Sequence, residues 1–191
     1  AMLYGRTPSG GFCLQPDADG DLWEPEWPVF HVDWHGARAY MAWRRRRTGL
    51  PWRLPGELEW EKAARGVDGR VYPWGPTLDP SWCRMHDSAL GGPKPVRVDT
   101  YPVDVSVYGV RGVGGNTRDW CADIEGRVDD ARVAVPGPDA DDGRRTVRGG
   151  SWFDAPRNAR VANRDRNAVG LRLPLNGFRG ALRFRDLASG A

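Results

Sequence analysis

Three closely spaced carboxylates are the first candidates for chemistry. Glu57, Glu59 and Glu61 lie within RLPGELEWEKAARG, residues 53–66. Carboxylates that stand close together can act as general acid and general base. These three follow Pro55 at the start of an expected helix, where exposed acidic side chains complement the positive end of the helix dipole. We therefore expect them to stabilise the helix rather than to catalyse a reaction.

The three histidines are the candidates for metal ligands. His31 and His35 stand four residues apart, and His86 is remote from both. Two histidines and a carboxylate can hold iron. However, Asp33 and Trp34 put the first two histidines at a junction between a strand and a helix. We expect satisfied or exposed imidazoles here rather than an iron site.

The cysteines argue against a zinc site and against a disulfide framework. Cys13, Cys83 and Cys121 are odd in number and show no CxxC spacing. Unpaired thiols favour a reducing compartment. No signal peptide opens this sequence, so a cytoplasmic location is the favoured expectation.

The elements that must position these residues are two helices followed by short strands and long loops. A helix over about 34–47, capped by Asp33, presents Ala37, Tyr40 and Met41 to a core. A second helix opens after Pro55 and closes at Gly66. The 25 Gly and 16 Pro among 191 residues indicate a single loop-rich domain rather than a helical bundle.

The charge pattern gives little support for nucleic acid or a membrane as partner. The net charge is +3, and among the 28 basic residues only Lys62 and Lys94 are lysines. The one basic run, 44–47, closes the first expected helix, where cations complement the dipole. No apolar run approaches the length of a membrane span.

Four sequence motifs, which follow one another along the chain, then point to a family. They are RLPGELEWEKAARG (53–66), YPWG (72–75), GVRGVGGNTRDWCAD (109–123), and VRGGSW (147–152) with NGFR (176–179). Together they resemble the formylglycine-generating enzyme, or sulfatase-modifying factor, family. The resemblance covers roughly 28–184 and implies an α+β variant of the C-type lectin fold.

Glycines at 149, 150 and 177 allow tight bends. Arg148 and Arg179 are expected to fix loops by binding carboxylates such as Asp119 or Asp123.

The catalytic residues that the resemblance would imply do not match. Active members use cysteines shortly after the GGSW-type motif to bind copper, whereas this chain reads FDAPRNARVANRDRN there. Cu(I) selects soft sulfur ligands, which Asp and Asn cannot replace. Sulfoxide-forming members use iron held by a histidine cluster, which three scattered histidines do not supply. The chain is therefore expected to be non-catalytic, and no cofactor is required.

Calcium is the metal that the resemblance still allows. It implies a structural calcium ion near GGNTRDW, with Asn116 and Asp119 as candidate oxygen ligands. Asp119 stands where the family often has Glu.

The asparagines and leucines near the C-terminal end suggest a different function. Asn and Lys codons are both AT-rich, and this chain has only two lysines. Four of its five asparagines nevertheless fall within 158–176. One branch of the resembled family comprises the variable proteins of diversity-generating retroelements, in which template adenines are randomised. Family sequences often carry Asn at several positions between 153 and 175 where this chain carries other residues. The predicted variable, ligand-contacting positions are Phe153, Asp154, Ala155, Arg157, Asp165, Ala168, Val169, Leu171, Leu173, Pro174 and Leu175.

The sequence therefore predicts a binding module. Phe153, Leu171, Leu173 and Leu175 are expected to form an exposed apolar patch with a rim that includes Arg172, which is the usual anatomy of a protein-binding site. The ligand would be an unidentified protein or other macromolecule. Two alternatives remain open: an undiversified interaction module, and a formylglycine-generating or sulfoxide-synthase-like oxidase.

The expected organisation is one domain with short flanking segments. Residues 1–27 are expected to be an irregular N-terminal segment, 28–185 the lectin-like domain, and 186–191 a tail. Members of the resembled family are often fused to kinase-like or other signalling domains. The resemblance therefore implies possible fusion to an N-terminal signalling domain.

Overall fold

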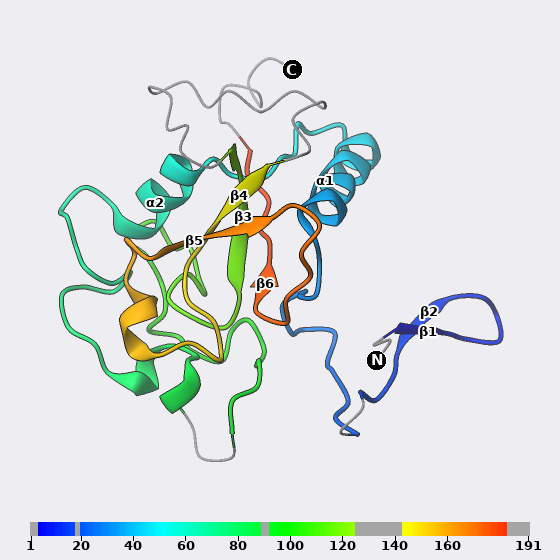
Figure 1. Ribbon diagram of the computed structural model, residues 1–191, viewed down its shortest axis with the longest axis horizontal. Helices are drawn as coiled ribbons and strands as arrows, with labels where there is room; N and C mark the ends of the chain where they lie inside the picture. The colour runs from blue at the N-terminus through cyan, green and yellow to red at the C-terminus, as the bar shows by residue number, and fades with distance from the viewer. Residues whose placement is uncertain (1–3, 18–19, 89–91, 125–142, 183–191) are drawn as a thin grey trace.

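The computed structural model describes residues 4–17, 20–88, 92–124 and 143–182. Two helices lie on either side of a small twisted sheet, and long loops make up most of the rest (Figure 1). None of the helices in these ranges is long and apolar enough to cross a membrane. The α+β architecture with two helices and short strands confirms the expected fold class.

Helix α1, Trp34–Thr48, has the ends that the sequence predicts. The Asp33 side chain accepts a hydrogen bond from Gly36 N at 2.7 Å, which caps the N-terminus. Gly49 ends the helix in the left-handed region at φ 71°, a conformation that glycine adopts without strain. Ala37 and Met41 face the core as expected, but Tyr40 does not, because its side chain is 40% exposed.

Helix α2, Glu57–Arg65, also follows its sequence signals. The Glu59 carboxylate accepts a hydrogen bond from Gly56 N at 2.9 Å, which satisfies one of the unpaired donors at the helix start. Gly66 ends the helix. Trp60 and Ala64 are buried, and so is Glu57, which was expected in an exposed first turn.

The central sheet has four strands in the order β5-β4-β3-β6. β3 (Arg118–Ile124), β4 (Arg144–Arg148) and β5 (Arg164–Ala168) pair antiparallel. The short β6 (Asn176–Gly177) pairs parallel with β3, which departs from the expected antiparallel pattern. A Cβ on Gly177 would lie 2.3 Å from Val29 O, so this position needs glycine.

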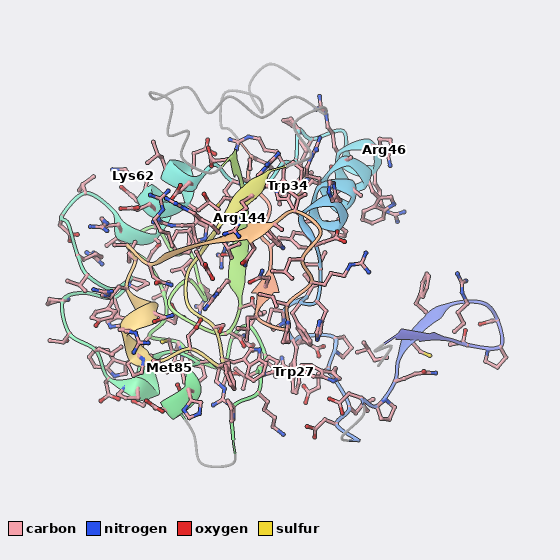
Figure 2. The ribbon with its side chains drawn as sticks, viewed as in Figure 1. Trp27, Trp34, Arg46, Lys62, Met85 and Arg144 are labelled. Carbon is pink, nitrogen blue, oxygen red and sulfur yellow. The ribbon has the colours of Figure 1, made fainter. Side chains whose placement is uncertain are left out.

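Side-chain alternation along β3 divides the core between the two faces of the sheet. Trp120 and Ala122 pack with Trp34, Met41 and their neighbours on the α1 side. Cys121, between them in sequence, packs with residues of the α2 side. Figure 2 shows Trp34 between α1 and the sheet, where its indole N–H donates to Cys121 O at 2.9 Å.

The N-terminal segment is more regular than expected. β1 (Tyr4–Arg6) and β2 (Phe12–Leu14) form an antiparallel hairpin that stands away from the body of the domain (Figure 1). The described loops contain three short 3₁₀ turns: η1 (Pro80–Trp82), η2 (His86–Ser88) and η3 (Pro156–Ala159).

Candidate functional site

The loop that follows β5 is held by its backbone. Val169 O accepts from Trp34 N at 3.1 Å, and Leu173 O accepts from His31 N at 3.2 Å. Leu175 O accepts from Arg118 N at 2.9 Å. Main-chain carbonyls are present whatever the side chain, so these bonds do not depend on residue identity at 169–175.

The Trp152 side chain also anchors this loop, by binding a main-chain carbonyl of the loop. The indole N–H of Trp152 donates to Pro174 O at 3.1 Å, and Trp152 N donates to Asn116 O at 2.9 Å. The segment around 152 is thus tied both to the loop and to the start of β3. This arrangement brings the two predicted variable stretches, near 153 and 171–175, to one region of the surface.

The exposed part of this region is smaller than the predicted apolar patch. Phe153 is 55% exposed and Leu171 is 39% exposed. Leu173 and Leu175 are half-buried, so the expectation that they belong to an exposed apolar patch is met only in part. Among the remaining predicted positions, Ala155, Asp165, Val169 and Pro174 are half-buried, and Arg157 and Ala168 are exposed.

Asp154 is a structural residue and not an exposed contact. Its carboxylate binds Arg118 through two hydrogen bonds, at 2.9 Å and 2.5 Å, and accepts from Ser151 Oγ at 2.7 Å. The Asp154 side chain is 9% exposed and that of Arg118 is 10% exposed. The third guanidinium nitrogen of Arg118 binds Asp165 at 2.6 Å, and the Asp165 side chain is 46% exposed. Asp165 therefore remains at the surface.

One residue at this surface, His86, was not predicted to belong to it. The His86 ring lies 6.0 Å from that of Phe153, edge to face, and His86 Nδ1 is 2.7 Å from Asp87 Oδ1. His86 N also donates to Asp154 O at 3.0 Å. Nothing in the sequence links η2 with residues 67 positions later. Arg172, at the rim, binds Asp33 at 2.8 Å with its own side chain 69% exposed.

A buried ion cluster supports the sheet from the α2 side. Glu57 accepts from Arg148 at 2.8 Å, from Arg164 at 2.6 Å and from Thr146 Oγ1 at 3.3 Å. Arg148 also binds Glu61. The expectation that Arg148 binds Asp119 or Asp123 is therefore wrong, because the Arg148 side chain faces α2.

The two candidate calcium ligands already bind hydrogen-bond donors. Asp119 accepts from Trp60 Nε1 at 2.8 Å and from Arg179, which confirms the expected contact of Arg179. The Asn116 carboxamide pairs with Val96 N and Val96 O at 3.1 Å and 2.9 Å. A guanidinium on Asp119 does not suit a cation ligand, and no cluster of three or more metal-ligating side chains occurs within the described ranges. Calcium binding stays a prediction.

The described thiols are not arranged as a reactive or metal-binding pair. Cys83 and Cys121 are buried in different core clusters, and burial raises the pKa of both thiols above the ordinary value. Cys13 lies on the N-terminal hairpin. His31 and His35 flank the start of α1, and burial lowers the pKa of His31.

Asp104 lies buried beneath the GGNTRDW motif and gives the fold a pH dependence. It accepts from Gly114 N at 2.9 Å, and burial raises its pKa from 3.8 to about 6. Because the folded protein binds this proton more tightly than the unfolded chain, stability falls as pH rises from near 4 through 6. Between about pH 4.5 and about pH 7.5 this carboxyl is expected to cost about 2 kcal/mol.

The measurement is urea unfolding at both pH values for the wild type and for Asp104→Asn. The variant keeps an acceptor but has no charge to bury, so the wild type is expected to lose more stability than the variant on going to the higher pH. Because Asp33 and other groups titrate in both proteins, their contributions cancel in the comparison. Identical pH dependence in the two proteins would contradict the assignment.

The sequence matches the model of the sulfatase-modifying factor enzyme 1-like domain over residues 9–184. It is 36% identical to the bovine protein named inactive C-alpha-formylglycine-generating enzyme 2, over 86% of this chain and 54% of that protein. It is 34% identical to a formylglycine-generating enzyme of Streptomyces coelicolor, over 98% and 60%. The chain thus spans little more than half the length of these relatives.

A protein kinase and two solved structures are also similar to this chain. A serine/threonine-protein kinase Pkn1 of Chlamydia trachomatis is 34% identical over 80% of this chain and 24% of the kinase. Among solved structures, PvdO from Pseudomonas aeruginosa superposes with a TM-score of 0.71 at 24% identity, covering 93% of this chain and 69% of PvdO. Treponema denticola variable protein 1 superposes with a TM-score of 0.68 at 22% identity, covering 88% and 77%. At these identities the two structures establish a shared fold.

Proposed function

Given that the chain belongs to the sulfatase-modifying factor enzyme 1-like family, we propose that it is a non-catalytic binding module of that family. Its binding surface is built on the exposed positions of 153–175 together with His86. The ligand is a protein or another macromolecule. These positions are diversified by a retroelement, as the asparagine pattern and the fold shared with a Treponema variable protein suggest.

The observation that carries the proposal is the backbone anchoring of 169–175. Four carbonyls of this loop bind groups outside it, namely Trp34 N, His31 N, Trp152 Nε1 and Arg118 N. These four bonds therefore hold the loop whatever the identity of the side chains that a ligand would contact. A rigid scaffold with replaceable surface side chains is what a diversified binding site requires.

Two facts weigh against the oxidase alternative. Residues 153–167 contain no cysteine, and the two buried thiols lie in separate clusters. A relative named as inactive also exists within the family. Stoichiometric copper or iron in the purified protein would contradict the binding function and favour an oxidase.

Tolerance of the surface to variation is directly testable. A displayed library randomised at the exposed positions Phe153, Arg157, Ala168 and Leu171 is expected to remain mostly resistant to protease, because surface substitutions usually change stability by about 0.5 kcal/mol or less. Selection of that library against a chosen soluble protein is then expected to yield specific binders.

The matched control is a library of the same size at buried positions of the same stretch. Its positions are Asp154, Val161, Asn167 and Asn176. Most of its members are expected to be cleaved. Equal loss of folded members from the two libraries would show that the proposed surface is part of the fold and not a variable site.

Diversification itself is tested in the DNA around the gene. A nearby reverse transcriptase gene and a near-copy of codons 147–180 that differs at adenines are expected. A near-copy without adenines opposite Leu171, Leu173, Pro174 and Leu175, or no copy at all, would contradict diversification and leave a fixed interaction module.

A further inference from the structure

A hollow of about 390 Å³ lies beside α1, and none of the predicted variable positions lines it. Its floor is apolar and includes Trp34, Met41, Trp52, Leu54 and Ala122. Trp34 and Met41 come from α1, 52–54 from the link between the helices, and Ala122 from β3. A concave apolar floor of this kind accepts a side chain rather than a flat surface.

The charged residues that line this hollow are all basic within the described part of the chain. They are arginines: Arg38 and Arg45 come from α1, and Arg53 follows it. Arg53 is paired with Glu59 at 2.6 Å, whereas none of the described carboxylates forms an ion pair with Arg45. Helix α1 carries five arginines and no acidic residue. Arg45 therefore adds to this lining a positive charge that the described carboxylates do not neutralise.

A second hollow, of about 420 Å³, adjoins the first and shares Met41 and Trp52 with it. Tyr40, Phe178 and Arg44 complete most of its lining. Trp52 Nε1 and Arg44 Nε are buried without a hydrogen-bond acceptor. Tryptophan, tyrosine and arginine are the residues that dominate binding energy at protein interfaces.

We propose that these two hollows, together called the α1 groove, bind an acidic polypeptide segment that inserts an apolar side chain. The basic lining attracts the acidic residues, and the apolar floor receives the anchor side chain. The groove uses none of the predicted variable positions. It is thus a second binding site, distinct from the surface of the proposed function.

The rings of Trp34 and Trp52 favour a polypeptide over a nucleic acid. Single-stranded nucleic acid binds by stacking bases on open aromatic faces. Here the guanidinium of Arg38 lies 4.5 Å from the centre of the Trp34 ring, and that of Arg145 lies 4.3 Å from it. Trp52 is covered in the same way by Arg44, at 4.4 Å. Arginine side chains thus already cover part of the ring surface on which a base would stack.

The test is fluorescence anisotropy with a labelled peptide of Asp and Glu residues around a central Leu-Trp pair, at low ionic strength. Arg45→Glu is expected to weaken binding about tenfold or more, because it reverses a charge that lines the groove. Arg46→Glu is the matched control. It makes the same charge change one position away, on the outer surface of α1 (Figure 2), and is expected to weaken binding less than about threefold.

Three results would overturn the proposal. The first is no binding of the acidic peptide by the wild type. The second is equal weakening by both variants, which would show attraction to net charge without a groove. The third is equally tight, Arg45-dependent binding of an oligonucleotide of the same charge, which would assign the groove to nucleic acid. Phe153→Ser is expected to leave peptide affinity unchanged, and this control separates failure of the groove from failure of the variable surface.

Discussion

Replacing Glu57 with alanine is expected to lower the free energy of unfolding by about 3–5 kcal/mol, the range measured when one partner of a buried ion pair is removed. The Glu57 side chain is 5% exposed and that of Arg148 is 2% exposed. Without Glu57, the more exposed Glu61 is the one ionic partner that Arg148 keeps among the described residues. Arg164 also loses its bond to the same carboxylate.

Urea unfolding near neutral pH measures this effect, and Glu61→Ala is the matched control. Glu61 binds the same arginine, but its side chain is 31% exposed. Its removal is expected to cost about 1 kcal/mol or less, because solvent screens the pair. Equal losses in the two variants would mean that burial of Glu57 does not set the energetics of the cluster.

Asp154→Ala is expected to lower the free energy of unfolding by about 3 kcal/mol, at the lower end of that range for buried pairs. The substitution removes both hydrogen bonds that hold the Arg118 guanidinium, along with the acceptor for Ser151 Oγ. Asp165 continues to bind Arg118 and limits the loss.

The neighbouring residue supplies the control for this prediction. Phe153 is 55% exposed, and Phe153→Ala is expected to change stability by about 0.5 kcal/mol or less. Both residues belong to the stretch that the sequence assigns to ligand contact. A large difference in thermal or urea unfolding between the two variants would separate scaffold from binding surface. Similar costs would contradict the structural role given to Asp154.

The helices follow from the sequence because their signals are local. Asp33 caps the start of α1, Gly49 ends it in the left-handed region, and Gly66 ends α2. Each of these residues acts within one turn of its own position. The family resemblance, carried by four ordered motifs, supplies the rest of the architecture.

The environment of Glu57 does not follow from the sequence. A carboxylate in a first helical turn usually faces water, and α2 alone offers no reason to bury it. Its partners Arg148 and Arg164 lie 91 and 107 residues further along the chain. They meet it only because β4 and β5 pair in register, with Arg148 opposite Arg164. Such contacts depend on tertiary packing, which local pattern does not encode.

The candidate binding surface was predicted in outline but not residue by residue. The sequence identifies 153–175 as unusual, yet Phe153 and Asp154 are adjacent and have opposite environments. Which of them points outward is decided by Arg118, 36 residues away from Asp154. His86 could not be assigned to this surface from sequence, since η2 reaches Phe153 only through the fold.

The position of β5 at the edge of the sheet bears on solubility. An edge strand exposes unpaired backbone groups that invite pairing with another chain, and here it leads directly into a loop rich in leucine. Consecutive charged residues, Arg164, Asp165 and Arg166, occupy this strand. Charges on an edge strand oppose strand-to-strand association. The charges of β5 can thus oppose association through this sheet edge even though the adjacent loop is apolar.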